Sequence, residues 1–475
     1  MKEARNPNFV EALIPVIFMM VAILVCTLLW EMEPHIPIVL SCIAAAFVAK
    51  WCGYSWSTLI TGMLESIGRA TEALIIVMVV GMLIGSWVMC GTMPSMIYYG
   101  LSLLSPQMFL VVGVTLTFIV GMATGSSWTA SGTIGVSLMG IAMGLGINPA
   151  IAAGMVISGA YMGDKWSPLS DSTNVAAATA ETPLYSHVRS MTNTTIPAFI
   201  LACILYAIMG VTVVPAGYDP HVVIEIQEAI KGEFNMITWW LILPTLFVIF
   251  AAVKRIPAIP SLLAAAGIGC VFSLLFQGRS MAEVLQALHY GYEADTGLYA
   301  VDRLLNRGGL DSMMWTISLI IFALAFGGIL EKCGFVETLL GNVTRKIKSL
   351  GGLVAATILT SIACDIVLTD QYLAIIVPGR LFAKAYDERG LDRCFLSRVL
   401  EDGGTLWSPL VPWNGCGAYQ SATLGVHNFA FLPYAFINLL TPIISVVFTI
   451  FGFGVIYKDE SKNKSIWKKL LKSKA

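Results

Sequence analysis

Long apolar segments separated by short polar links run along the whole chain. A helix needs roughly 20 predominantly apolar residues to cross a bilayer. Segments near that length or longer occur at residues 10–30, 36–52, 72–91, 148–180, 190–214, 236–253, 258–276, 312–330, 391–424 and 429–456. Only 12% of the residues are charged, against about 25% in an ordinary soluble protein. The pattern predicts an all-α polytopic membrane protein.

Other segments do not fit a simple crossing. Residues 106–146 and 351–390 are each about twice the length that one crossing needs and are interrupted in the middle, so we interpret them as re-entrant hairpins. Residues 54–71 and 280–290 place apolar side chains at helical spacing, as amphipathic helices on a membrane surface do. The remaining stretches are interpreted as links or loops: 94–105, 215–235, 291–311 and 334–350.

The two halves of the chain share a sequence pattern. The tetrapeptide WSPL at 166–169 recurs at 407–410, and Gly163 matches Gly404 at the same offset of 241. Upstream, a steady offset of 244 relates Trp128, Gly135 and Gly146 to Tyr372, Gly379 and Gly390. One three-residue gap therefore aligns both cores, which predicts an internal repeat of hairpin, broken helix and final helix.

Charge placement predicts the topology, because basic residues favour the cytoplasmic ends of transmembrane helices. Acidic links at 31–33, 215–235 and 291–311 then lie outside, which requires each half to cross an odd number of times. We predict two inverted-topology repeats, each with five crossings, one re-entrant hairpin and a broken helix, and both termini in the cytoplasm. Counting each long segment as two crossings would give twelve or more, place the halves in parallel and spoil this charge pattern.

The predicted organisation follows from that topology. The first repeat spans 1–214, with scaffold helices at 1–105 and a transport core at 106–214, and an external loop follows at 215–235. The second repeat spans 236–456, with its scaffold at 236–350 and its core at 351–456, before a basic cytoplasmic tail at 457–475. The N-terminus lacks a small-residue cleavage pattern, so we expect a first transmembrane helix rather than a signal peptide.

A change in charge marks the candidate site. Residues 73–163 contain no Asp, Glu, Lys, Arg or His, and then Asp164 and Lys165 arrive together. A charge at the centre of a membrane segment costs about 3 kcal/mol or more, so such residues are functional candidates. Pro168 and Gly163 predict a break in the helix here, where freed carbonyls and helix ends coordinate ions in transporters.

Oxygen ligands of the kind that suit Na+ or Li+ surround this break. We expect Na+ at Asp164, Asp171, Thr173 and Asn174. The second half lacks the aligned acids but carries others, and hairpin tips and helix breaks from opposite faces should meet. The full set of predicted cation- and proton-binding residues is Asp164, Asp171, Ser170, Thr173, Asn174, Asp370, Asp365, Asp402 and Asn414. Supporting residues are Lys165, Ser126, Ser127, Trp128, Trp166, Ser167, Pro168, Glu401, Trp407, Ser408 and Pro409.

Structural roles are the alternative for these acids. Asp171 would cap the helix that restarts at Ser172, and Asp164 would pair with Lys165. Lys165 could instead neutralise the empty site and be released when a cation arrives. The ten cysteines are dispersed without a Cys-x-x-Cys pair and are expected to be packing residues.

Competition between ions suggests a mechanism. Burial raises the pKa of a carboxyl group, by up to ~3–5 units when it is complete. A proton and Na+ then compete for the same oxygens, and alternating access exchanges one for the other. No phosphate-binding loop occurs, so no nucleotide is expected, and we expect no cofactor beyond the transported Na+ and H+.

The stretch GDKWSPLSDSTNVAA at 163–177 resembles the signature of the NhaC-type Na+/H+ antiporter family, which reads close to GDKxSPLSDTTNLA. TGSSW at 124–128, TDQYLAIIVPGR at 369–380 and GGTLWSPLVPWNGCGAYQ at 403–420 are also similar to that family. Ser172 and Val175 replace its usual Thr and Leu. The resemblance implies exchange of Na+, often Li+, for H+ across the cell membrane, and a fold like that of the wider ion-transporter superfamily.

The same resemblance leaves a second function open. Some relatives look like Na+-coupled antiporters of malate and lactate, and Thr173 and Asn174 resemble loops that hold carboxylates in the wider superfamily. A Na+/H+-coupled organic acid exchanger is therefore the alternative, with a small organic acid as a further partner. Arg380 and Arg398 could lend positive charge, although Arg380 fits better as a cytoplasmic anchor.

Other classes fit less well. An intramembrane aspartyl protease resembles a family that needs Gly-x-Gly-Asp, but Tyr161 occupies the first Gly position. A passive channel suits an inverted repeat with titratable acids less well than alternating access does. We expect a transporter and no enzyme, in contact with membrane lipid and with no nucleic acid. A homodimer is compatible with the scaffold helices, but no residue requires it.

Overall fold

The computed structural model of the chain describes residues 4–30, 32–212, 220–341 and 347–459. Within these ranges the chain is helical, with no strand beyond an isolated bridge between Leu391 and Tyr457. Seven of the described helices are long and apolar enough to cross a membrane, or eight if the bent pair Asn428–Tyr434 and Phe436–Ile450 forms one span. The prediction of an all-α polytopic membrane protein is confirmed. The number of crossings and their inversion stay predictions.

The first half contains the predicted hairpin and broken helix. The hairpin is formed by α6, the short α7 and η2, and α8, and the broken helix by α9 and α10. The elements are α1 (Phe9–Leu24), η1 (Val25–Leu29), α2 (His35–Trp51), α3 (Trp56–Arg69), α4 (Thr71–Met89), α5 (Thr92–Leu103), α6 (Pro106–Thr124), α7 (Ser127–Ala130), η2 (Ser131–Gly135), α8 (Val136–Gly144), α9 (Pro149–Trp166), α10 (Asp171–Thr179) and α11 (Leu184–Thr212).

The second half has a second hairpin, α19 and α20, and a second interrupted helix, which runs from α21 through η6 and η7 to α22. The elements are α12 (Pro220–Glu233), η3 (Trp239–Ile242), α13 (Leu243–Val253), α14 (Ala258–Phe276), α15 (Met281–Tyr290), α16 (Tyr299–Leu305), η4 (Asp311–Met313), α17 (Met314–Lys332), α18 (Phe335–Leu340), α19 (Leu350–Leu368), α20 (Gln371–Asp387), α21 (Arg393–Leu400), η6 (Glu401–Thr405), η7 (Ser408–Leu410), α22 (Gly415–Leu424), α23 (Asn428–Phe431), η8 (Leu432–Tyr434) and α24 (Phe436–Ile450).

Several predicted links are wrong, because each contains a helix. α5 lies in 94–105, α12 in 215–235, α16 in 291–311 and α18 in 334–350. These segments are too short or too polar to be transmembrane crossings, and the sequence pattern therefore predicts no helix there. Residues 213–219, 342–346 and 460–475, which include most of the predicted basic tail, lie outside the described residues.

Some predicted boundaries also change. The last segment is not one helix: it bends by 55° between η8 and α24. The segment predicted at 236–253 becomes helical only at Trp239, and α11 begins at Leu184, six residues before the predicted start. Length and hydropathy do not distinguish hairpin arms from full crossings. The hairpin helices α6 and α19 are each long and apolar enough to cross a membrane.

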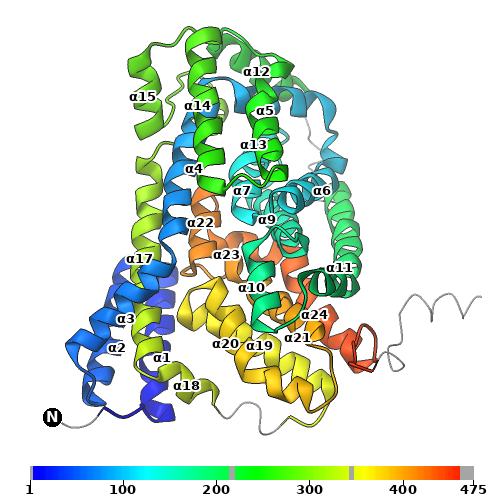
Figure 1. Cartoon of the computed structure of the whole chain (residues 1–475). Coiled ribbons are helices and arrows are strands. Elements are labelled where there is room, and N and C mark those ends of the chain that lie inside the picture. The colour runs from blue at the N-terminus through cyan, green and yellow to red at the C-terminus, as the bar shows by residue number, and fades with distance from the viewer. Residues whose placement is uncertain (1–3, 31, 213–219, 342–346, 460–475) are drawn as a thin grey trace, which may run out of the picture.

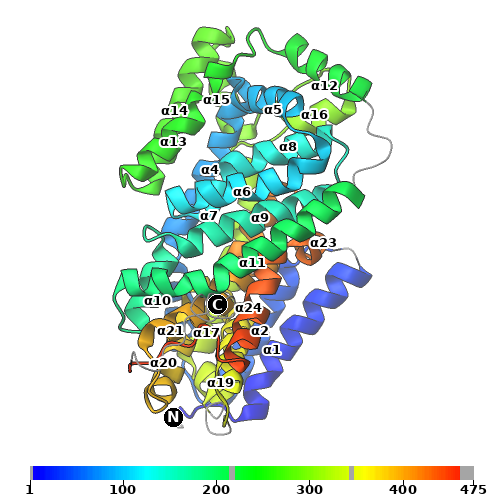
Figure 2. The ribbon, with the colours of Figure 1, turned by 90° about the vertical axis from the view of Figure 1, so that its right-hand side faces the viewer.

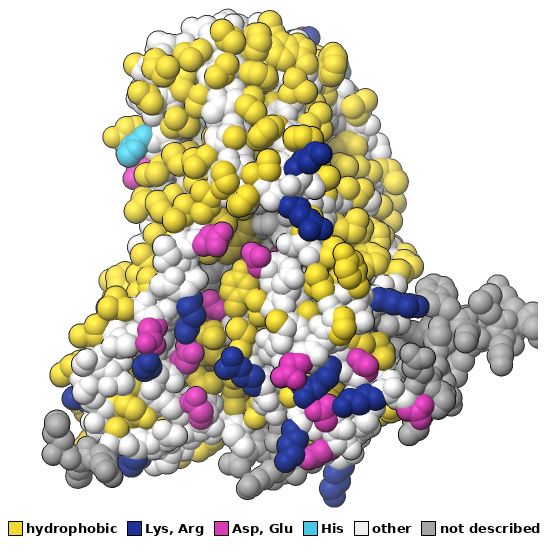
Figure 3. Space-filling view, viewed as in Figure 1, with side chains coloured by type: hydrophobic (Ala, Val, Ile, Leu, Met, Phe, Trp, Pro, Cys, Tyr) yellow, Lys and Arg dark blue, Asp and Glu magenta, His cyan; other side chains and the backbone are white. Residues whose placement is uncertain are grey.

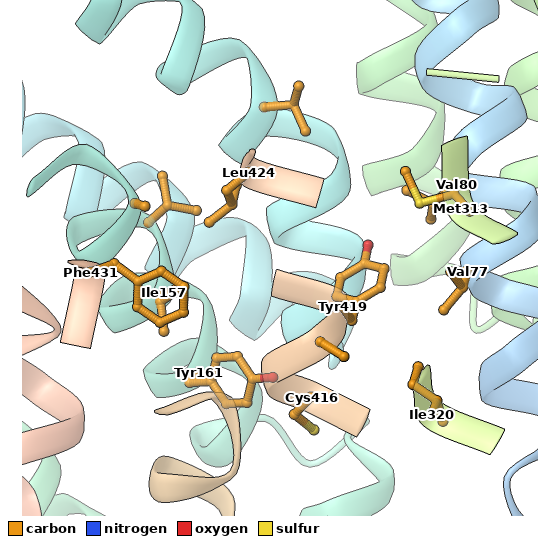
Figure 4. Packing of buried hydrophobic residues seen from close by; sticks show 14 of the residues in the cluster. Val77, Val80, Ile157, Tyr161, Met313, Ile320, Cys416, Tyr419, Leu424 and Phe431 are labelled. Atoms are coloured by element: carbon orange, nitrogen blue, oxygen red, sulfur yellow. The ribbon is translucent and has the colours of Figure 1, made fainter. Parts of the chain in front are cut away.

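Helices from the two halves interleave in space (Figures 1 and 2). α3 and α4 of the first half run beside α17 and α14 of the second, and α11 lies along α6 and α24. One buried hydrophobic cluster joins the halves: Tyr161 of α9 lies near Cys416 and Tyr419 of α22 (Figure 4). The amphipathic α3 is bound to α17 by ion pairs between Glu65 and Lys332 at 2.8 Å and between Arg69 and Glu331.

Glycines let α6 and α9 approach closely, which holds the hairpin against the broken helix. Gly159 and Gly163 lie four residues apart on α9 and face α6: a Cβ added at Gly159 would overlap Thr117 and the carbonyl of Val114. Small residues at this spacing are the usual means by which membrane helices pack backbone to backbone.

Gly159→Ala should therefore destabilise the protein, because overpacking a well-packed interior costs about 1–3 kcal/mol. Thermal unfolding of the detergent-solubilised protein, followed by intrinsic fluorescence, should show a melting temperature several degrees lower. Gly267→Ala on α14 is the matched control, since a Cβ there meets no atom within 4 Å. Equal melting temperatures for both variants would refute the close α6–α9 packing.

Candidate ion-binding site

The tip of the first hairpin is a tight turn between α6 and α7. Gly125 has φ of +64° and ends α6, its N–H bonding the Gly121 carbonyl at 2.8 Å. Ser126 then caps α7, its hydroxyl accepting the Thr129 N–H at 3.1 Å. A Cβ at Gly125 would fall 2.8 Å from the Ser170 nitrogen, so the glycine lets the tip contact the break in the neighbouring helix.

The break between α9 and α10 lies later than predicted. Gly163, Asp164 and Lys165 are helical and form the last turn of α9, while residues 167–170 leave the helix. The hydroxyl of Thr173 donates to the Lys165 carbonyl at 3.1 Å and so joins the two helical segments across the break. Ser170 occupies the N-cap position of α10.

Asp164 lies where the hairpin tip meets this break. Its Oδ2 accepts two hydrogen bonds from Ser127, at 3.1 Å from the backbone N–H and 2.6 Å from the hydroxyl. The residue is 7% exposed, and among the described residues it forms no ion pair with a basic side chain; Lys165 and Arg398 pair with Asp402. The alternative that Asp164 pairs with Lys165 is therefore wrong.

Lys165 pairs with the second half instead. Its ammonium contacts the carboxylate of Asp402, and both side chains are almost completely buried. Thr194 of α11 donates to the same carboxylate at 3.1 Å, and Arg398 lies 3.9 Å from its other oxygen. This pair joins α9 to η6, one element from each half of the chain.

A cavity of about 1000 Å³ opens beside Asp164. The space-filling view shows a hollow with acidic side chains at its edge on the face where charged residues gather (Figure 3). Both hairpin tips and both breaks contribute to its wall. Predicted residues that line it are Ser126, Ser127, Trp128, Asp164, Pro168, Ser170, Asp171, Asn174, Asp370 and Asn414.

The remaining Na+ candidates of the first half do not surround one point. Asp171 and Asn174 are exposed on the cavity wall, and the amide of Asn174 donates to the Ser170 carbonyl at 2.7 Å. Asp171 makes no capping hydrogen bond, since α10 has none from a side chain. The alternative that Asp171 is a helix cap is therefore wrong.

The acidic side chains of the second half do not gather at one site. Asp370 caps α20 by accepting the Leu373 N–H at 2.8 Å. Asp365 is buried away from the cavity lining and accepts from Asn414 at 3.1 Å. Asp402 is engaged by Lys165, and Glu401 is buried beside it.

Several supporting residues have local partners. Trp166 stacks on Phe118 at 5.9 Å, and Trp128 stacks on Tyr419 of α22 at 4.2 Å. Ser408 donates to the Thr405 carbonyl at 2.9 Å. Ser167 and Pro409 are buried within the two breaks, and Trp407 is half-buried.

Thr194 and Gln371 are site neighbours that the sequence analysis missed. Gln371 accepts from Ser408 at 3.1 Å and lines the cavity. The repeat offset of 244 places Gln371 opposite Ser127, so the alignment contained a signal for it. Nothing in the sequence marks Thr194, one of several hydroxyl residues on α11.

Comparison with known proteins shows the family of this chain. The model of the Na+/H+ antiporter family matches residues 159–453. The Na+/H+ antiporter NhaC of Alkalihalophilus pseudofirmus is 38% identical over 94% of this chain and 96% of its own length. The chain belongs to the Na+/H+ antiporter family.

Other members of the family have different names. The arginine/ornithine antiporter ArcD of Halobacterium salinarum is 36% identical over 97% of this chain and 95% of its own length. The malate-2H+/Na+-lactate antiporter of Bacillus subtilis is 32% identical over 98% of this chain and 99% of its own length. The predictions of an antiporter rather than an enzyme, and of a membrane location, are confirmed.

The buried Lys165–Asp402 pair leads to a prediction about the stability of the protein. Lys165→Met leaves Asp402 as a buried charge short of its partner, which should cost about 3–5 kcal/mol. The double variant Lys165→Met/Asp402→Asn should recover part of that loss, because the unpaired Asp402 charge is removed while Arg398 keeps its hydrogen bond to the Gly454 carbonyl. SDS titration of the solubilised protein measures the free energies of unfolding.

The matched control is Lys332→Met, which breaks a half-exposed pair with Glu65. Exposed pairs contribute about 0–1 kcal/mol, so this variant should be nearly neutral. A direct ion pair would be contradicted if the double variant lost as much unfolding free energy as the two single variants lose together.

Proposed function

We propose that this protein is a secondary transporter that exchanges Na+ for H+ by alternating access, with Asp164 as the principal cation ligand. One observation carries the proposal: Asp164 is a buried carboxylate beside an open cavity and has no cation partner, because the neighbouring Lys165 is engaged by Asp402. A buried carboxylate of this kind requires either a cation or a proton.

Oxygen atoms suited to Na+ or Li+ are available around Asp164. The Ser127 and Ser170 hydroxyls line the cavity with it, and Asp171 supplies a second carboxylate on the wall. Hard cations of this type prefer carboxylate, hydroxyl and carbonyl oxygens. Thr173 and Asn174 are bonded to backbone carbonyls here, so their predicted role as ligands requires those bonds to open.

The charges around the cavity favour a cation over an organic acid as the main substrate. The lining contains four acids, Glu72, Asp164, Asp171 and Asp370, and two arginines, Arg69 and Arg255. Arg69 is itself paired with Glu331. The organic acid exchanger is the second candidate, since a cavity of about 1000 Å³ holds a solute much larger than Na+.

We further propose that the chain comprises two inverted repeats at 1–214 and 236–456, each with five crossings and one re-entrant hairpin. Matching helix caps support a repeat. Ser126 and Asp370 cap helices at the two hairpin tips, at the offset of 244 found in the sequence upstream of the breaks. Ser170 and Asn414 occupy the N-cap positions of the helices that follow the two breaks.

Orientation follows from the same charge rule as in the sequence. Arg69 and Arg255 line the cavity at helix ends, and basic residues favour the cytoplasmic ends of transmembrane helices. We therefore propose that the structure is open to the cytoplasm, with both termini on that side and the chain in the cell membrane. Contact with lipid and a homodimer belong to the proposal, although nothing in the site requires a second copy.

Asp164→Asn should abolish Na+-dependent proton flux in proteoliposomes, by at least 100-fold, because the amide offers no charge to either ion. Asp295→Asn is the matched control, because Asp295 is an exposed loop residue that does not line the cavity. Flux of Asp164→Asn within threefold of wild type would refute the assignment, provided that both variants purify as folded monodisperse protein.

The substrate is tested in the same vesicles with Na+, Li+ and K+, each with and without malate or lactate. Proton movement driven by Na+ alone is the expected result. A strict requirement for the organic acid would instead establish the exchanger.

A further inference from the structure

Arg398 is a buried arginine beside the Lys165–Asp402 pair. It lies on α21, one helical turn before Asp402, and is 1% exposed. Its Nε is 3.9 Å from Oδ2 of Asp402, and neither atom has a hydrogen-bond partner among the described residues. Lys165 and Thr194 contact the other oxygen, Oδ1. Two buried cations therefore face one carboxylate, and only Lys165 is in contact with it.

The chain beyond the last helix holds the guanidinium of Arg398 away from Asp402. α24 ends at Ile450, and Nη1 of Arg398 donates to the carbonyl of Gly454 at 2.9 Å. The contact of Nη1 with the Ser190 carbonyl is longer, at 3.4 Å. Among the described residues, the Gly454 carbonyl is therefore the closest acceptor that Arg398 has.

Residues 452–458, which we call the C-terminal segment, are fixed to the core helices α20 and α21. The bonds run from the Asp392 N–H to the Ile456 carbonyl at 2.9 Å, from the Lys458 N–H to the Gly390 carbonyl at 3.0 Å, and from the Lys458 ammonium to Asp387 at 2.9 Å. Gly454 has φ of +67°, a conformation that favours glycine. These bonds fix the carbonyl that Arg398 uses.

Arg398 would displace Lys165 from Asp402 if the Gly454 carbonyl withdrew. A buried N–H that loses its acceptor costs free energy until it finds another. Oδ2 of Asp402 is unused, and a shift of about 1 Å would bring Nε within hydrogen-bond distance of it. A guanidinium binds a carboxylate through two parallel N–H bonds, whereas an ammonium is a point charge.

A displaced Lys165 needs another counter-charge, because an unpaired buried charge is strongly destabilising. Asp164 precedes it in the chain and has no basic partner among the described residues. An ammonium at Asp164 would occupy the oxygens that Na+ needs. The position of Arg398 therefore determines whether Asp164 is free for Na+.

We propose that the C-terminal segment and Arg398 position Lys165 for the exchange. The Gly454 carbonyl keeps Arg398 off Asp402, so Lys165 stays on Asp402 and Asp164 stays free for Na+. Arg398 acts through Lys165 and touches neither transported ion. The effect on transport rests on the proposed Na+/H+ exchange, whereas the choice of partner for Asp402 is a property of the fold.

Two glycines provide a matched pair of variants. Gly452 and Gly454 both have positive φ, +73° and +67°, so valine strains the backbone at either position. A Cβ at Gly454 lies 3.2 Å from Asn193 and 3.5 Å from Nη1 of Arg398, whereas a Cβ at Gly452 meets no atom within 4 Å.

Gly454→Val should raise the half-saturating Na+ concentration for proton movement in proteoliposomes by about fivefold or more. The maximal rate should stay within about threefold of wild type, because Lys165 then competes with Na+ and saturating Na+ overcomes it. Gly452→Val should leave both values within about twofold of wild type. An unchanged half-saturating concentration in folded Gly454→Val would overturn the proposal.

A second change separates positioning from a merely structural role. Adding Arg398→Gln to Gly454→Val should return the half-saturating Na+ concentration to within about twofold of wild type, because no guanidinium remains to take Asp402. A structural role of the segment predicts a further loss instead. Failure of the folded double variant to recover would overturn the role of Arg398.

Lys458→Glu covers the case in which Gly454→Val does not fold. It places like charges at Asp387 and so loosens the C-terminal segment, which should raise the half-saturating Na+ concentration at least about twofold. Lys384→Glu is its control, since Lys384 is exposed and lies 3.9 Å from Glu388. Equal values in the two variants would contradict the proposal.

A stability measurement tests the change of partner without transport. Lys165→Met should lower the melting temperature of Gly454→Val or Lys458→Glu by at most about half as much as it lowers that of the wild type, because Arg398 then pairs with Asp402. Equal decreases would overturn the inference even if the protein exchanges Na+ for H+. Absence of Na+-dependent flux in the wild type would instead remove the proposed function and leave this result standing.

Discussion

Inside a membrane protein each buried charge needs a counter-charge, and the pairing of Lys165 with Asp402 decides which carboxyls are left without one. Lys165 follows Asp164 directly in the sequence, yet it contacts an acid from the other half of the chain. This pairing leaves Asp164 to its hydrogen bonds with Ser127, without a basic partner among the described residues. The exchange that we propose depends on this unneutralised carboxyl.

Local backbone geometry brings the site together. Asp164 remains on the last turn of α9 because the break starts only at Ser167. The left-handed turn at Gly125 brings the hairpin tip against the break, so that Ser127 reaches Asp164. The close packing of α6 on α9 through Gly159 and Gly163 fixes this position. A change in the hairpin would therefore reach Asp164 through Ser127 and through the α6–α9 packing.

The sequence predicted most of the long helices but not the contacts between distant residues, because helices have local sequence signals and distant contacts do not. Hydropathy and Pro168 located the broken helix within a few residues, and the charge-free run pointed to Asp164. Short helices such as α5 and α18 were missed because apolar length was the signal for a crossing. The partner of Lys165 lies 237 residues away in the chain, and no local pattern encodes such a pairing.

The central claim is that Na+ binding displaces a proton from the site around Asp164. Isothermal titration calorimetry of the purified wild type with NaCl, in buffers of different ionisation enthalpy, measures this directly. The account predicts that the observed enthalpy varies with the buffer, with a slope of about one proton released per Na+ bound near neutral pH. Saturable Na+ binding whose enthalpy is the same in every buffer would contradict the account.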